Sequence, residues 1–213
     1  MATPARLGLV GDVHAEDTLL RLALERLAAD GAEAVLCTGD IVDGQGDVDE
    51  CCRLLQEHGV LAVRGNHDRW FLAGKNLALP HATTHVAPTS QRYLAALPTT
   101  VELSTAGGPL LLCHGVGEND MAAVKPDDLG YALEANLDLQ RLIEQAPQGL
   151  LVVAGHSHVP MVRRLGPLVL VNPGTLMRGQ TPAFLQLDRA TETVTFFRFA
   201  QGRFQPDGEL SLP

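Results

Sequence analysis

The sequence predicts an α/β fold with a parallel sheet near its start and more antiparallel strands after it. Two patterns of apolar residues support this prediction. In the first 65 residues, short apolar runs alternate with segments whose leucines recur at helical spacing. Such alternation is typical of right-handed crossovers between parallel strands. In the second half, most apolar runs are separated by a few residues that contain Gly, Pro or Asp, which favours antiparallel hairpins.

Three strands and two helices are expected in the first 65 residues. Residues 16–29 carry leucines at helical spacing, and residues 48–58 indicate a second helix. The strands are the apolar runs 7–10, 34–37 and 60–63.

The second half predicts seven further strands and one helix, at residues 133–145. Two stretches, residues 69–100 and 116–130, lack strong periodicity. We interpret them as loops or lids over a site, with plain surface connection as the alternative. The strands are expected at residues 101–103, 110–113, 150–154, 161–165, 169–171, 183–187 and 193–199.

Length and composition predict one domain that spans residues 1–213. Hydrophobic residues make up 46% and charged residues 19%, which excludes a disordered chain. The apolar runs are far shorter than the ~18 residues that cross a bilayer. The N-terminus shows no apolar segment of secretory length, and the four cysteines form no CxxC motif. We therefore expect a cytoplasmic protein without a disulfide framework or a membrane partner.

The formal net charge is −9, and the positive residues are scattered. Proteins that hold extended nucleic acid are usually basic, so this class is disfavoured. A small nucleotide substrate remains compatible with the charge.

Polar residues that can bind metals follow five predicted strands, at the point where each strand ends. In open α/β sheets, ligands bind at the carboxyl ends of strands. Residues two apart, as in Asp-x-His and His-x-His, project from the same side of an extended segment. Five of the eight histidines lie in these junctions. The junctions are Gly11-Asp12-Val13-His14, Thr38-Gly39-Asp40, Gly65-Asn66-His67-Asp68, His114-Gly115 and Gly155-His156-Ser157-His158.

Each junction alone has a plain structural interpretation, such as a Gly-Asp turn or a buried core histidine. The combination is harder to explain in this way, because turn chemistry would not select His and Asp repeatedly over Ser, Thr and Lys. Nitrogen and oxygen ligands without a thiolate suit Mn, Fe, Zn, Co or Ni better than Ca or Mg.

In this order, the motifs resemble those of the calcineurin-like metallophosphoesterases. The resemblance runs from about residue 6 to about residue 175 and includes the sequence Asn-Pro-Gly-Thr at 172–175, similar to a turn of the small phosphodiesterase branch. It implies a four-layer α/β/β/α sandwich, with mixed sheets and helices on both outer faces.

The resemblance also implies two divalent transition-metal ions per chain, manganese foremost, with iron, zinc, cobalt or nickel as alternatives. Two ions roughly 3.5–4 Å apart can share a hydroxide and clamp a displacement at phosphorus. The implied ligands are Asp12, His14 and His158 for the first ion, Asn66, His114 and His156 for the second, and Asp40 as the bridge between them.

The two residues that follow Asn66 have other implied roles. In the family, the histidine at the position of His67 stabilises the developing charge and protonates the leaving alkoxide, which suits an imidazole with a pKa near the working pH. Asp68 resembles the acidic partner that orients this ring. Its alternative role is to cap the helix that follows, and the two roles are compatible.

Two departures from related branches bear on the substrate. Gly44 stands where the protein-phosphatase branch has an arginine that clamps the phosphoryl group, and Asp68 stands where that branch has Glu. The small phosphodiesterase branch often has Cys where this chain has His67. A phosphoprotein substrate is therefore disfavoured, whereas monoesters and cyclic phosphates stay plausible beside diesters.

Several residues near the motifs are candidates for substrate contact, with a solvated loop as the alternative for each. Trp70 could stack on a base, but its Trp-Phe-Leu context favours a core role. The candidate phosphate contacts are Arg69, Lys75, Lys125 and Arg178, and the candidate pocket residues are Asn119 and Asp120.

The function that the sequence favours is hydrolysis of phosphodiester bonds by attack of a metal-bridging hydroxide. The expected substrate is a small phosphate ester, with nucleotides included and extended nucleic acid excluded, and self-association is left open. Alternatives are a phosphomonoesterase, acting on a phosphorylated metabolite or a phosphoprotein, and an interaction scaffold without turnover. This fold occurs in trafficking-complex subunits that have lost ligands, whereas no ligand is missing here. A nuclease is a further alternative, and the acidic charge counts against it.

Overall fold

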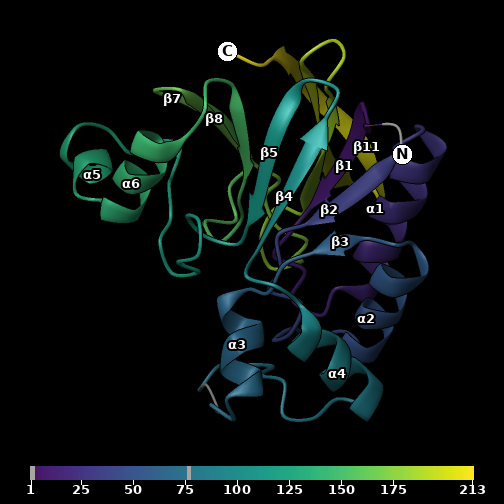
Figure 1. Ribbon diagram of the computed structural model, residues 1–213. Coiled ribbons are helices and arrows are strands. Elements are labelled where there is room, and N and C mark those ends of the chain that lie inside the picture. Colours follow the sequence, from purple (N-terminus) through teal and green to yellow (C-terminus); the bar gives the residue numbers. More distant parts are fainter. Residues whose placement is uncertain (1–2, 76–77) are drawn as a thin grey trace.

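Two β-sheets pack face to face at the centre of the molecule, and helices lie on both outer sides (Figure 1). The computed structural model describes residues 3–75 and 78–213. The first sheet has the order β11-β10-β9-β1-β2-β3 and the second has the order β4-β5-β6-β8-β7. Helices α1 and α2 flank the first sheet, α4 lies beside α2 and α3, and α5 and α6 flank the second sheet (Figure 1).

The elements of the described residues have the following bounds. The first sheet consists of β1 (Arg6–Val10), β2 (Ala34–Cys37), β3 (Leu61–Ala62), β9 (Ala183–Asp188), β10 (Thr193–Ala200) and β11 (Arg203–Ser211). The second consists of β4 (Thr100–Thr105), β5 (Gly108–Cys113), β6 (Leu150–Val153), β7 (Met161–Leu165) and β8 (Leu168–Asn172). The helices are α1 (Asp17–Ala29), α2 (Val48–Glu57), α3 (Asn66–Leu72), α4 (Pro88–Ala96), α5 (Tyr131–Glu134) and α6 (Leu137–Gln145).

Three apolar clusters hold the four layers together. One lies between α1, α2, α4 and the first sheet, one lies between the two sheets, and one lies between the second sheet and α6. Alternation along β1 explains this division: Leu7 and Leu9 enter the cluster between the sheets, whereas Val10 belongs to the cluster on the helical side. The predicted four-layer α/β/β/α architecture is confirmed.

The strand pairing follows the sequence patterns with one difference. The pairs β1·β2 and β2·β3 are parallel, and the hairpins β4·β5, β7·β8 and β9·β10 are antiparallel. Strand β6, however, pairs in parallel with both β5 and β8. For β5·β6, the reason is that residues 114–149 are long enough to cross over and contain α5 and α6. For β6·β8, the chain first forms β7 and then turns back, so that β8 lies beside β6.

Part of the stretch that we expected to be a loop, residues 69–100, is helical. Helix α3 extends to Leu72, and α4 occupies residues 88–96. Helix α4 was hard to predict because it is short, begins with Pro88 and buries only Ser90 and Leu94.

Two further parts of the fold differ from the sequence prediction: the helix expected at 133–145 and the strand β11. The predicted helix at 133–145 is divided into α5 and α6, because the Asn136 side chain accepts a hydrogen bond from the backbone N–H of Leu139 and starts a new helix. Strand β11 was missed, since it is an edge strand that contains Pro206 and Gly208 and buries only Phe204.

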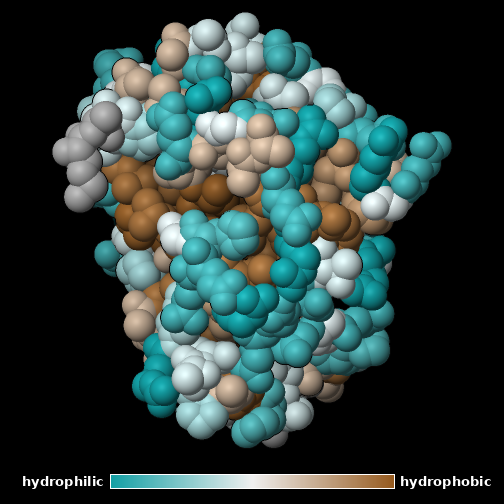
Figure 2. Space-filling view, turned by 90° about the vertical axis from the view of Figure 1, so that its right-hand side faces the viewer, coloured by the Kyte–Doolittle hydropathy of each residue, from teal (hydrophilic) through white to brown (hydrophobic). Residues whose placement is uncertain are grey.

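Apolar side chains reach the surface on one face. Figure 2 shows them as a band across the right-hand side of Figure 1, with hydrophilic residues above and below. At the edge strand β3, Leu61 is 40% exposed. No described helix combines the length and the apolar character that a membrane crossing needs.

Candidate metal centre

The five strand-end motifs meet at one place, at the carboxyl ends of strands from both sheets. Two groups of side chains there could each hold a metal ion, and within each group the ligand atoms lie within 4.8 Å of one another. Asn66 lies beside the second group, because its Oδ1 is 2.9 Å from Nε2 of His114. The first group is Asp12, His14, Asp40 and His158, and the second is Asp40, His114 and His156. The structure thus brings together the seven ligand candidates, with Asp40 common to both groups.

Five of the seven ligand candidates have a strained backbone conformation, with a positive φ angle. Non-glycine residues rarely adopt positive φ, and holding one there costs on the order of 1–3 kcal/mol. Residues kept in this conformation cluster at functional sites. Five ligand candidates have such angles: Asp12 (45°), His14 (46°), Asp40 (49°), His156 (65°) and His158 (61°).

Two glycines let the chain approach the carboxylates closely. A Cβ atom at Gly65 would lie 2.1 Å from Oδ1 of Asp40, and one at Gly155 would lie 2.6 Å from Oδ2 of Asp12. A larger residue at either position would displace Asp40 or Asp12, so the geometry accounts for the glycine at these two positions.

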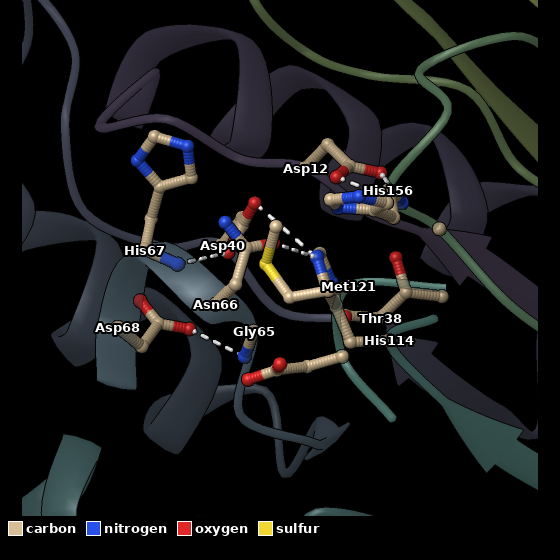
Figure 3. A network of polar contacts seen from close by, with 12 residues as sticks. Asp12, Thr38, Asp40, Gly65, Asn66, His67, Asp68, His114, Met121 and His156 are labelled. Carbon is tan, nitrogen blue, oxygen red and sulfur yellow. Dashed lines mark hydrogen bonds and ion pairs between the residues drawn. The ribbon is translucent and has the colours of Figure 1, made fainter. Parts of the chain in front are cut away.

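Backbone carbonyls orient two of the histidine rings. Nδ1 of His14 lies 3.0 Å from the Asp43 carbonyl oxygen, and Nδ1 of His114 lies 2.7 Å from that of Thr38. A carbonyl can only accept, so each Nδ1 donates its proton, which leaves the lone pair on Nε2 for a metal. Figure 3 shows His114 with Asn66 and Asp40 on this Nε2 side.

The electrostatics of the centre favour a bound cation. Asp12 and Asp40 are buried, at 0% and 1% exposed, and a buried carboxylate needs a positive partner. Burial would lower the pKa of His114, but Asp40 outweighs it and raises that pKa to about 10. Burial likewise opposes ionisation of Asp40, but His114 holds the pKa of that carboxyl below its usual range. A divalent ion would replace the proton that His114 carries. The mixed nitrogen and oxygen ligands, without thiolate, fit a transition metal.

His67 lies next to the centre and outside both ligand groups. Its ring centroid is 5.0 Å from that of His14, and its backbone N–H donates to Oδ1 of Asp40 at 2.9 Å. Nδ1 of His67 contacts Oδ2 of Asp43 at 2.7 Å. Burial would lower the pKa of His67, but the hydrogen bond with Asp43 and the nearby carboxylate charges together outweigh this effect and raise it.

The acidic partner that we expected for the His67 ring was Asp68, and the structure puts Asp43 there instead. Asp68 is 0% exposed and accepts hydrogen bonds from the backbone N–H groups of Ile41, Val42 and Gly65. It therefore ties the first turn of α3 to the turn that follows Asp40. Burial raises the pKa of Asp68 to about 7, and the Asp40 charge acts in the same direction.

Asp43 is the residue near the site that the sequence reasoning missed. The available signal was its place in Gly39-Asp40-Ile41-Val42-Asp43, three residues after a ligand candidate. The turn at 172–175 also has a structural role, because the Thr175 hydroxyl donates to the Asp12 carbonyl oxygen at 2.7 Å and so supports a ligand residue.

Both arginines among the candidate phosphate contacts are paired with carboxylates. Arg69 makes two hydrogen bonds to the Asp120 carboxylate, at 2.6 and 2.8 Å. Arg178 pairs with Glu16, which is only 1% exposed. Lys125 lies in the irregular segment 116–130, where its backbone N–H donates to Asp128.

Comparison with known proteins gives the same family as the motifs. The model of the calcineurin-like phosphoesterase superfamily domain matches residues 6–192. A metallophosphoesterase from Sphaerobacter thermophilus is 21% identical, with a TM-score of 0.69 over 94% of this chain and 89% of that one. The phosphoesterase YfcE from E. coli is 19% identical, with a TM-score of 0.62 over 98% and 100% of the chains.

Vps29 from Entamoeba histolytica is also similar, at 19% identity and a TM-score of 0.59 over 98% of this chain and 99% of that one. At these identities, the structural likeness shows the fold. The family model covers most of the sequence and includes all the strand-end motifs. The chain therefore belongs to the calcineurin-like phosphoesterase superfamily.

Proposed function

We propose that the chain is a dinuclear metal-dependent phosphoesterase that acts on phosphodiester bonds of small substrates. The observation that carries the proposal is the pair of ligand groups that share Asp40. Asp12, His14 and His158 would hold one ion, and Asn66, His114 and His156 would hold the other. Manganese heads the candidate metals, followed by iron, zinc, cobalt and nickel.

When bound, the two ions would activate a water molecule for attack at phosphorus and offset the charge of the phosphoryl group. The protein would supply their geometry. Asp40 is held by the His67 backbone N–H, and both Asp12 oxygens accept from the His156 N–H at 3.1 Å. These contacts orient the carboxylates without occupying all their lone pairs.

His67 would protonate the leaving group. Asp43 engages Nδ1, so Nε2, which has no hydrogen-bond partner within the described part of the chain, is left to donate. The raised pKa of His67 favours the protonated ring that a general acid needs. Asp43 is then a positioning residue, and Asp68 supports the fold of the turn.

Charge favours a diester over a monoester. A diester carries about one negative charge at neutral pH and a monoester nearly two. Gly44 stands where the protein-phosphatase branch has its clamping arginine, and Arg69 and Arg178 are paired with carboxylates. Fewer guanidinium groups are therefore free for a dianion, which supports the diester. A phosphomonoesterase remains the second candidate.

An interaction scaffold without turnover is the candidate from another class. It is kept because this fold also occurs in trafficking-complex subunits, and Vps29 shares the fold. The complete ligand set and the ordered His67–Asp43 pair count against it, since binding alone would not need a general acid.

Hydrolysis of bis-p-nitrophenyl phosphate and p-nitrophenyl phosphate tests the proposal. The protein would be stripped of metal and reconstituted with Mn, Fe, Zn, Co, Ni or Mg, with metal content measured in parallel. We expect metal-dependent cleavage of the diester ahead of the monoester, with two ions per chain. A monoester preference would support the second candidate, and two bound ions without turnover would support the scaffold.

A further inference from the structure

Trp70 lies beside the candidate general acid. Its ring centroid is 5.1 Å from that of His67, which in turn is 5.0 Å from that of His14. The three rings therefore follow one another outward from a ligand of the first ion. In the proposed mechanism, the leaving group departs on the side of His67, so Trp70 is placed next to the departing group rather than next to the retained phosphate.

The core role that the sequence favoured for Trp70 does not hold. Its neighbours Phe71 and Leu72 pack against the helical-side apolar cluster, whereas Trp70 belongs to none of the three clusters formed by the described residues. The Trp70 side chain is partly exposed. A partly exposed indole beside a catalytic histidine offers an aromatic surface for a ligand.

The residue before Trp70, Arg69, connects α3 to the segment 116–130. Arg69 is held by the two hydrogen bonds to Asp120, which belongs to the segment 116–130 that follows His114. The Arg69 guanidinium also lies 5.8 Å from the Trp70 ring. Met121, next to Asp120, is 48% exposed and is drawn with the site residues in Figure 3. These contacts tie α3 to the neighbouring segment and limit the freedom of the indole.

We propose that Trp70 determines substrate specificity by stacking on a planar aromatic leaving group, such as a nucleoside base or an aryl ring. The inference rests on the proposed function, because His67 defines the leaving-group side. It narrows the substrate class to phosphate esters whose leaving alcohol carries an aromatic ring. Stacking of this kind tolerates different bases, since each presents a flat face.

Fluorescence tests the contact without turnover, because Trp70 is the only tryptophan of the chain. Zinc-loaded protein would be titrated with adenosine 5′-monophosphate and with ribose 5-phosphate, which differ only in the base. We expect saturable quenching by the nucleotide and little change with the sugar phosphate. Equal responses to both, or no response while both bind, would overturn the inference.

Kinetics test the consequence for specificity. The probes are methyl phenyl phosphate and methyl trifluoroethyl phosphate, each compared between variant and wild type so that intrinsic reactivity cancels. We expect Trp70→Leu to lower kcat/KM for the phenyl ester on the order of tenfold and for the alkyl ester less than about twofold. Trp70→Phe should restore most of the loss. Phe71→Leu, which changes a core-facing neighbour in α3, should leave the ratio of the two esters unchanged.

An equal loss for both esters in Trp70→Leu would mean that the indole only supports His67, and no loss would mean that it does not touch the substrate. Either result overturns the inference. If the wild type hydrolyses neither ester with any metal, the proposed function fails, and the fluorescence titration still decides whether Trp70 contacts a base.

Discussion

The metal centre differs in burial from the described parts of the two connections 73–100 and 116–145, which follow its motifs in the sequence and which we call the rim. Centre residues such as Asp12, Asp40 and Asn66 are at most 2% exposed and sit on strand ends of packed sheets. On the rim, Leu129 and Tyr131 are 73% and 82% exposed, in or next to a segment without regular structure. From this contrast we expect that the buried centre determines the proposed reaction and that changes on the exposed rim bear on the choice of substrate.

The largest effect is expected from Asp40→Asn, which removes the group common to both ligand sets. Both metal sites should weaken together, and hydrolysis should fall on the order of 10³-fold or more. Elemental analysis of the purified protein and the diester assay measure the two effects. Asp127→Asn, which removes one charge at an exposed position, is the matched control. Loss of one ion with the other tightly bound would contradict the bridging assignment.

The next largest effect is expected from His67→Ala. Because His67 lies beside the ligands but not among them, kcat should fall about 10²-fold or more while the metal content stays unchanged. His85→Ala, at an exposed position, is the control. A protein that lost metal in His67→Ala would place this ring inside the centre and remove the distinction between ligand and general acid.

A comparison of Asp43→Asn with Asp68→Asn separates catalysis from folding within the centre. Asp43→Asn should lower kcat about tenfold with little change in metal content, because Asp43 orients the His67 ring. Asp68→Asn should instead lower the free energy of unfolding by about 1–3 kcal/mol, since it accepts three backbone hydrogen bonds in the interior. Denaturant titration and steady-state kinetics of both variants check this. The opposite pattern would return the ring-orienting role to Asp68.

The centre could be predicted from the sequence because its residues stand in short motifs at strand ends, where the fold leaves little freedom. The partner of His67 could not, since Asp43 and Asp68 are both acidic and both close to ligand candidates in sequence. Only the fold shows that Asp43 contacts the His67 ring, whereas Asp68 in α3 accepts from the backbone of the turn after Asp40. Trp70 shows the same limit. An apolar tripeptide predicts burial, but one turn of α3 directs Phe71 and Leu72 to the core and the indole to His67.

Periodicity also described the rim poorly. Helix α4 and the break between α5 and α6 depend on Pro88 and Asn136, single residues whose effect is local. Strands β1, β2, β9 and β10 of the first sheet, in contrast, rest on apolar runs that the sequence shows clearly, whereas its edge strand β11 does not. The position of the centre thus depends on the packing of strands that are distant in sequence, whereas the ends of α4 and α6 depend on single residues.

The smallest effect is expected from the ion pair between Arg69 of α3 and Asp120 of the segment 116–130. The pair of Arg69 and Asp120 has side chains that are 39% and 19% exposed, so its contribution to stability should be below about 1 kcal/mol. A double-mutant cycle with Arg69→Met and Asp120→Asn, measured by denaturant unfolding, gives this coupling. If the pair also steadies the segment 116–130, each variant should raise KM a few-fold and leave kcat unchanged, because the centre does not depend on it. A fall in kcat at constant KM would mean that the rim reaches the reacting groups, and the division between a rigid centre and an adjustable rim would no longer hold.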